Sequence, residues 1–236
     1  MIYRKLLSLF MFALLTSASF ATECECAHEC ALNCSTESEQ YDVQEEKFIH
    51  LKELMFEKIK DKANDFEEIR NSDDQFVEKC IRYSGIMFPL QMSAFKESGL
   101  GDSPQDLCKF FFKCGRTEKA KKRDLEIFDY TAEKSFGKVD KNPLSKELVD
   151  QISARVTEEF SKPEFTSQLQ ELLKNGSTDS ANCAEFSDFM KVTLRLTLEK
   201  HLEILSEFGL DGEEGYLRYT RGLCEHRTLW PCKKSS

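Results

Sequence analysis

The longest helical pattern in this 236-residue chain is NCAEFSDFMKVTLRLTLEKHLEILSEF, residues 182–208. Gly209 follows it directly, and glycine often closes a helix in the left-handed conformation. The pattern therefore predicts one long amphipathic helix that ends at Gly209. Its inner side would carry the residues that recur at three- and four-residue intervals, which are Cys183, Phe186, Phe189, Met190, Leu194, Thr197, His201, Ile204, Leu205 and Phe208.

Shorter segments upstream repeat this periodicity. Apolar residues at helical spacing predict a helix of about 25 residues around 48–69. Two serine-led segments, 72–75 and 161–164, have the pattern of capping boxes and would each begin a further helix. The helix that begins at 72–75 should end near Pro89. Further helices are predicted from Ser103, over 125–141, and from Ser145 to Phe160.

The composition agrees with helix rather than sheet. Six valines, ten glycines and five prolines are few for 236 residues, whereas leucine, glutamate, lysine and phenylalanine are abundant. We therefore predict an all-α fold, a disulfide-stapled helical bundle with irregular termini. The predicted organisation is a signal peptide (1–21), a cysteine-rich amino-terminal segment (22–40), a helical domain (41–209) and a cysteine-pinned carboxyl-terminal tail (210–236).

The first 21 residues have the three parts of a secretory signal peptide. Arg4 and Lys5 are basic, residues 6–15 are apolar, and Ser19-Phe20-Ala21 is a small-x-small cleavage site. The apolar stretch is too short for a bilayer span, which needs roughly 20 residues, and no later stretch approaches that length. We expect a secreted, extracellular chain that begins near Thr22, with a cut after Ala18 and an uncleaved anchor as the alternatives.

All ten cysteines lie in the mature part, and an even number in an oxidising compartment predicts disulfides. They are Cys24, Cys26, Cys30, Cys34, Cys80, Cys108, Cys114, Cys183, Cys224 and Cys232. The first four crowd into eleven residues, and helical neighbours have side chains that do not converge, so each would bond to a distant partner. Connectivity stays open.

The same cluster offers a second interpretation, a metal site. Four thiols and His28 are soft ligands within one short segment. A structural zinc site usually draws ligand pairs from separate knuckles, so we favour disulfides and predict no metal and no cofactor.

The charge excludes nucleic acid as an expected partner. The formal net charge is −9, and it becomes −11 in the mature chain because residues 1–21 contain two basic and no acidic residues. Counterion release needs a basic stripe, and the one dense basic run lies around Lys121-Lys122-Arg123. That run lies between predicted helices, where a dibasic-directed protease could cut it.

No catalytic motif is present. The four histidines, His28, His50, His201 and His226, lie outside any hydrolytic or metal motif, and nucleophile and phosphate-binding loops are absent. We expect His201 to be a core histidine bonded to a neighbouring carboxylate, since Glu199 and Glu203 are close in sequence. The chain is predicted not to be an enzyme.

Two sequons could accept N-glycans, at Asn33 and Asn175. Asn175 is the better acceptor, because it precedes a polar loop, whereas Asn33 adjoins Cys34.

The order of Cys80, a helix, the segment from Cys108 to Cys114 (CKFFFKC) and then Cys183 resembles the cysteine-rich helical domains of nematode secreted proteins of unassigned function. The resemblance covers about residues 76–205. It implies a secreted helical domain and no particular activity.

Three functions remain, in this order. The first is a non-enzymatic extracellular binding or interaction protein that presents an acidic surface to another protein. The second is a carrier of a fatty acid or other small apolar ligand, with Phe110–Phe112 lining its cavity. The third is a secreted hydrolase without a recognisable motif.

Overall fold

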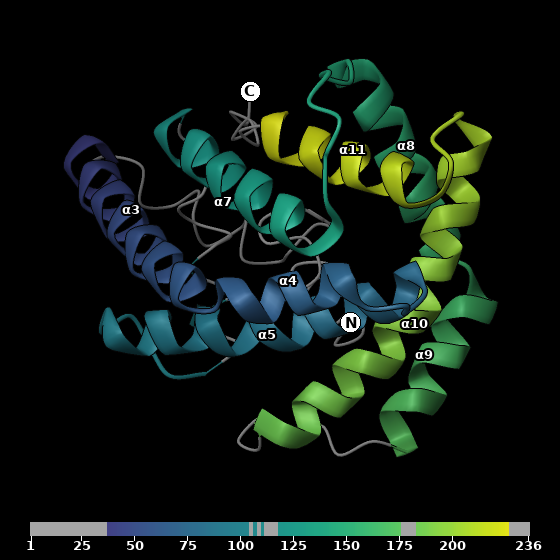
Figure 1. The fold of residues 1–236 in the computed structure, drawn as a ribbon, viewed down its shortest axis with the longest axis horizontal. Coiled ribbons are helices and arrows are strands. Elements are labelled where there is room, and N and C mark those ends of the chain that lie inside the picture. Colours follow the sequence, from purple (N-terminus) through teal and green to yellow (C-terminus); the bar gives the residue numbers. More distant parts are fainter. Residues whose placement is uncertain (1–36, 104–105, 108–109, 111–117, 176–182, 227–236) are drawn as a thin grey trace.

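A computed structural model describes residues 37–103, 106–107, 110, 118–175 and 183–226, and within these ranges all regular structure is α-helical (Figure 1). The all-α prediction is therefore confirmed for this part of the chain. The helices are α3 (Glu37–Asp61), α4 (Ala63–Asn71), α5 (Phe76–Glu97), α7 (Glu118–Phe136), α8 (Lys146–Phe160), α9 (Pro163–Asn175), α10 (Cys183–Glu207) and α11 (Gly212–Glu225). None of them is both long and apolar enough to cross a membrane.

The helices enclose two main clusters of buried apolar side chains. One lies among α3, α4, α5 and α7, and the other among α5, α8, α9, α10 and α11. α5 runs between the two, with Cys80 in the second cluster and Tyr83 in the first. Phe136, the last residue of α7, packs against both clusters and against a third, smaller one between α7 and α11. The apolar interior thus joins side chains from before and after residues 140–143, which form a loop between α7 and α8.

The long helix matches its prediction closely. Thr197, His201, Ile204 and Leu205 are buried along one side of α10. At its end Gly209 has a φ of +72°, and the amide of Leu210 donates to Leu205 O at 3.0 Å. That backward bond is the mark of a glycine-terminated helix, and it turns the chain toward α11.

Two of the serines predicted to begin helices end helices instead. Ser72 Oγ donates to Ile69 O at 2.8 Å, and Ser161 Oγ donates to Thr157 O at 2.7 Å. α5 begins after Gln75 with no side-chain cap. The capping-box prediction is wrong for both segments, because the consecutive helices are so close in sequence that the serine reaches the carbonyl behind it.

Two other predicted caps are confirmed. Ser145 Oγ accepts from the amide of Leu148 at 3.2 Å and begins α8. Ser103 Oγ accepts from the amide of Asp106, also at 3.2 Å, which is the bond expected of an N-cap.

Pro89 does not end α5, contrary to expectation. The helix continues from Phe76 to Glu97 with Pro89 inside it. Proline removes one amide donor, so the carbonyl four residues earlier, that of Gly85, loses its helical partner. Gly85 and Pro89 are both exposed, so water can solvate that carbonyl. Burial of the opposite face, with Met87, Ala94 and Phe95, keeps the helix continuous.

Replacing Pro89 with alanine should therefore raise the free energy of unfolding by about 1–3 kcal/mol, because it restores an amide donor in a helix interior. Urea unfolding followed by circular dichroism measures the change. Pro163→Ala is the matched control, since Pro163 is the first residue of α9, where no donor is missing. A gain at Pro163 equal to that at Pro89 would contradict this explanation.

The carboxyl-terminal segment is more regular than predicted. Residues 212–225, expected to belong to a cysteine-pinned tail, form α11, and Tyr216, Tyr219 and Leu223 lie in the second main cluster. Leu217 and Cys224 face the smaller cluster with α7. The prediction of an irregular terminus is wrong for these residues, because α11 has a strong apolar side that the interior buries, whereas the pinning of 210–236 by cysteines stays a prediction.

Candidate functional site

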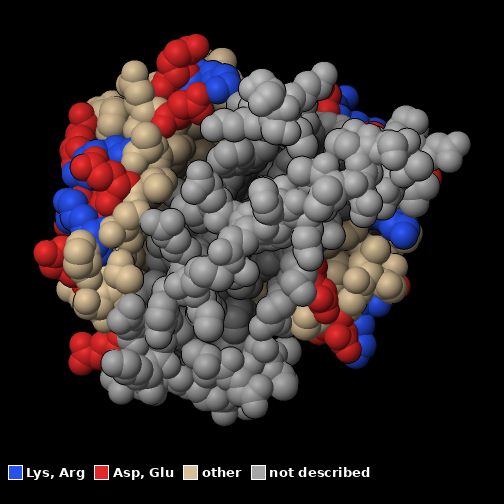
Figure 2. Space-filling model, turned by 180° about the vertical axis from the view of Figure 1, so that it is seen from behind, with Lys and Arg blue, Asp and Glu red and all other residues tan. Residues whose placement is uncertain are grey.

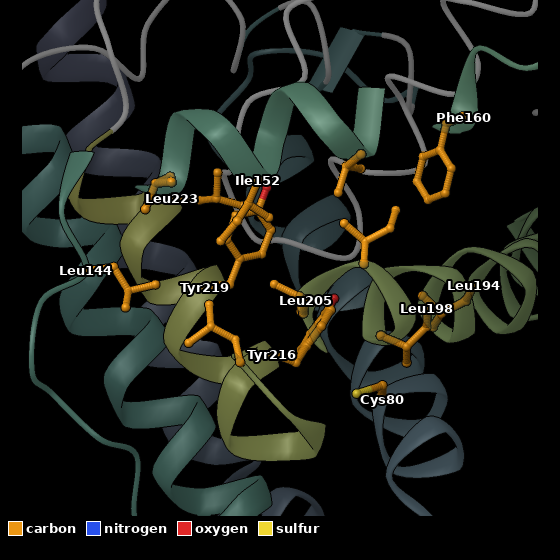
Figure 3. Close-up of a cluster of buried hydrophobic side chains, with 14 of the residues drawn as sticks. Cys80, Leu144, Ile152, Phe160, Leu194, Leu198, Leu205, Tyr216, Tyr219 and Leu223 are labelled. Atoms are coloured by element: carbon orange, nitrogen blue, oxygen red, sulfur yellow. The ribbon is translucent and has the colours of Figure 1, made fainter. Parts of the chain in front are cut away.

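A small cavity lies where α5, α7 and α11 meet. Its volume is about 20 Å³, and its wall includes Cys80 and Ser84 from α5, Phe128 from α7, and Tyr216 and Thr220 from α11. Figure 3 shows Cys80 and Tyr216 within the neighbouring apolar cluster, with Leu198 of α10 nearby. A thiol, hydroxyls and a cavity occur together here, so we treat this place as the candidate site.

Cys80 is a free thiol with 5% of its surface exposed. Burial raises its pKa well above the ordinary value, and Glu213 adds to this effect. A nucleophilic cysteine needs a lowered pKa, usually from a nearby cation or a helix N-terminus. The thiol at this site is therefore protonated and suited to packing rather than attack.

Two tyrosines next to the thiol are held neutral in the same way. Burial raises the pKa of Tyr83 and of Tyr216 far above the usual range for a phenol. The hydroxyl of Tyr83 shares a 2.9 Å hydrogen bond with Thr131 of α7, and Phe76 stacks edge-on against Tyr216. These side chains hold α5, α7 and α11 together and offer no proton near neutral pH.

His201 is a core histidine, as expected, but its partner is not a carboxylate. Its Nδ1 lies 2.8 Å from Thr197 O, one turn back in α10. The ring packs edge-on against Phe160 of α8 and Tyr216 of α11. Its Nε2 is buried without a hydrogen-bond partner. The expectation of a bonded carboxylate is wrong, because the neighbouring glutamates lie on the exposed side of α10.

Acidification should destabilise the fold through His201. Desolvation lowers its pKa from 6.5 to about 4, so the unfolded chain binds a proton more readily than the folded one. The stabilisation is complete above about pH 6.5 and is lost as the pH falls toward 4, with a total near 3 kcal/mol. Urea titrations between these pH values measure it. His201→Leu should flatten the pH dependence in this window, and an unchanged slope would contradict the assignment.

Of the ten predicted disulfide cysteines, two have described side chains. Cys80 is the free thiol of the cavity, and Cys224 is 1% exposed between α7 and α11. Cys183 begins α10, but its side chain is outside the described part. The remaining seven, Cys24, Cys26, Cys30, Cys34, Cys108, Cys114 and Cys232, lie outside the described residues, as do the signal peptide and Asn33. The disulfide framework remains a prediction.

The basic run has a different setting from the one expected. Lys121-Lys122-Arg123 lies inside α7, not between helices. Arg123 pairs with Glu126 on its own helix and lies over the Phe56 ring of α3. Because proteases bind extended backbone, the predicted processing site is closed while α7 is folded.

The other predicted residues are only partly described. Asn175 is the last residue of α9, and the rest of its sequon lies outside the described part. Phe110 packs against Phe48 and Phe95, with ring centroids 6.4 Å and 5.8 Å away, so these two rings already cover it. Phe111 and Phe112 lie outside the described residues.

The outer surface concentrates negative charge in two segments. Residues 63–75, which are α4 and the link to α5, contain five acidic residues and one basic residue. Residues 203–214, at the end of α10 and the start of α11, contain five acidic residues and no basic residue. Together they carry −9, equal to the formal charge of the whole chain, so the rest of the chain balances to zero. We call these two segments the acidic surface.

The starts of α5 and α11, which follow or overlap the two segments, are brought together by the fold. Phe76, the first residue of α5, packs against Tyr216 near the start of α11, with ring centroids 5.6 Å apart. Glu213 lies close enough to Lys79 for the lysine to oppose the rise in its pKa that burial causes. The amino-terminal ends of these two helices are also where the helix dipoles favour carboxylates.

Four side chains of the acidic surface are exposed and have no ion-pair partner among the described residues: Glu68, Asp73, Asp211 and Glu214, of which Asp211 accepts a hydrogen bond from Ser206 Oγ. Figure 2, the view from behind Figure 1, shows Lys and Arg beside Asp and Glu on the described parts of that side. Outside the acidic surface, exposed ion pairs such as Lys146 with Asp150 combine charges of both signs.

One interior feature was missed by the sequence analysis. Lys52 of α3 is fully buried and lies 2.6 Å from Asp124 of α7, which is 2% exposed. A signal for it existed: Lys52 falls four residues after Phe48 and three before Met55, on the inner side of the helix. A charged residue at an apolar position indicates a buried partner.

Comparison with known proteins adds no relative. No family model matches the chain, no curated protein matches it, and no solved structure matches the fold. The class that the fold and site define is an all-α protein with a closed, uncharged junction of helices and a strongly acidic part of its outer surface. Within the described residues, no group of three His, Cys, Asp or Glu side chains is arranged to hold a metal ion.

Proposed function

We propose that this chain is an exported binding protein, whose helical body, braced by disulfides, presents the acidic surface to a protein partner with a basic surface. The observation that supports this most directly is the distribution of charge: the 25 residues of the two segments carry −9 of the −11 net charge of the mature chain. Such a concentration favours encounter with a positively charged partner and rejects a negatively charged one.

The interior supports binding at the surface rather than chemistry inside. Cys80, Tyr83, Tyr216 and His201 all have pKa values displaced toward their neutral forms by burial. General acid or base catalysis needs a pKa near the working pH, which these groups lack. The cavity of about 20 Å³ at this junction is also far smaller than the roughly 300 Å³ that small-ligand sites begin at. It cannot accommodate the acyl chain of a carried lipid.

Export and disulfide bonding are tested on the full chain expressed in a eukaryotic secretory host. We expect secretion, an amino terminus at Thr22, and a mass about 2 Da below that of the reduced chain for each disulfide formed. A non-reducing peptide map then gives the pairs. Retention inside the cell with free thiols in the amino-terminal cluster would contradict this part of the proposal.

Binding through the acidic surface is tested with two variants of equal charge. Glu68→Gln/Asp73→Asn/Glu214→Gln neutralises three exposed acids of the acidic surface that have no ion pair among the described residues. Glu57→Gln/Glu147→Gln/Glu171→Gln neutralises three exposed acids elsewhere. The probe is a panel of secreted proteins of known net charge from the same source, measured by biosensor at low and at high salt.

We expect the basic members of the panel to bind the first triple variant at least tenfold more weakly than they bind the unmodified chain. They should bind the second triple variant almost as tightly as the unmodified chain. Binding should also weaken as salt screens the charges. Equal losses in both variants would mean that net charge alone acts, and no loss in either would overturn the acidic surface as the binding site. A lipid that native mass spectrometry detects and organic extraction removes would favour the carrier function instead.

A further inference from the structure

Ser84 is a buried polar residue at the junction of α5, α7 and α11. It lies on α5 with 7% of its surface exposed, and its Oγ has no hydrogen-bond partner in the described structure. Buried hydroxyls almost always have a partner, in the protein or in ordered water. Ser84 also forms part of the wall of the cavity between α5, α7 and α11, so the missing partner has a place to lie.

The cavity has the size of one water molecule. A cavity needs about 10–15 Å³ to hold one water molecule, and the volume of this cavity is about 20 Å³. The same volume leaves no room for an organic ligand. Eight of the nine residues that line it are buried, and Phe136 is partly exposed.

The wall offers further polar atoms across from Ser84. Thr220 of α11 donates its hydroxyl to Tyr216 O at 2.9 Å, which leaves the lone pairs of its Oγ1 available to accept. The Cys80 thiol, one turn before Ser84, is a weak donor. Purely apolar cavities stay empty, whereas a buried water molecule typically makes two to four hydrogen bonds to polar groups. Both conditions for occupancy, room and polar partners, are therefore met.

We infer that this cavity is a binding site for a single ordered water molecule, which is hydrogen-bonded to Ser84 Oγ and links α5 to α11 where the two apolar clusters join. The inference is independent of the proposed function, because it concerns the interior and not the acidic surface.

The experiment uses the full mature chain and has two readouts. Water-selective NMR should show cross-relaxation between a long-lived water molecule and protons of Ser84 and Thr220. In thermal unfolding, Ser84→Ala should lower the Tm by about 2–4 °C, because it removes a bond to the water molecule.

Ser135→Ala is the matched control. Ser135 of α7 also has a fully buried hydroxyl without a hydrogen-bond partner, but it is not among the residues that line this cavity. Removing a hydroxyl that lacks a partner should leave the Tm unchanged or raise it. Absence of the water signal at Ser84 and Thr220 would overturn the inference, and so would a Ser84→Ala variant that is as stable as Ser135→Ala.

Discussion

Replacing Asp124 with leucine should lower the free energy of unfolding by about 3–5 kcal/mol, the typical cost of removing one partner of a buried ion pair. Asp124 Oδ1 lies 2.6 Å from Lys52 Nζ, and the two side chains are 2% and 0% exposed. With the carboxylate gone, the ammonium group would remain buried in the cluster of α3, α4, α5 and α7 without its anionic partner, while the Phe48 ring lies 5.2 Å away. Urea unfolding of the variant measures the loss.

The double substitution separates the ion pair from the packing. Lys52→Met with Asp124→Leu removes both charges and keeps apolar volume, so the double variant should recover to within about 1 kcal/mol of the unmodified chain or exceed it. The control is Asp150→Ala, which breaks the exposed pair of Lys146 and Asp150 and should cost less than about 1 kcal/mol. A double variant as unstable as Asp124→Leu would mean that shape, not the unpaired charge, causes the loss.

The second large effect is expected at Gly215. A β-carbon at this position would lie 2.2 Å from the carbonyl carbon of Leu210 and 2.3 Å from its oxygen. Both are backbone atoms, so no side chain can move aside. Since Leu210 is itself buried in the main cluster, Gly215→Ala must displace the start of α11, and it should cost about 3 kcal/mol or more.

Gly85→Ala is the matched control for this substitution. Gly85 lies inside α5, and a β-carbon there would meet no atom within 4 Å. Alanine is favoured over glycine in a helix, so this variant should gain about 0.5–1 kcal/mol. Thermal unfolding should therefore show a lower Tm for Gly215→Ala and a higher Tm for Gly85→Ala. A small change in stability for Gly215→Ala would mean that the start of α11 lies farther from the Leu210 backbone than in the structure.

The acidic surface and the candidate site differ in how far the sequence could predict them. The net charge and the two acidic segments are visible in the sequence, but the packing of Phe76 at the start of α5 against Tyr216 of α11 is a tertiary contact. The cavity was not predictable at all, because Ser84 and Thr220 carry no motif and their proximity comes from helices about 130 residues apart.

The failed predictions at Ser72, Ser161 and Pro89 share one physical origin. Ser72 and Ser161 have the composition of N-caps, yet a preceding helix within reach competes for their hydroxyls. Pro89 is a helix breaker locally, yet burial of the opposite side of α5 outweighs one missing hydrogen bond. Propensity describes a segment alone, whereas tertiary contacts contribute comparable free energies from residues far away in sequence.

By itself the sequence determined that the described part of this protein is helical, where most of its helices lie, and that α10 ends at Gly209, because amphipathic periodicity and glycine conformation are local properties. Only the tertiary structure decided that Lys52 pairs with Asp124, that His201 bonds to a backbone carbonyl, and that α11 belongs to the interior. Those features depend on which helix sides face one another, and packing of the whole chain fixes that choice.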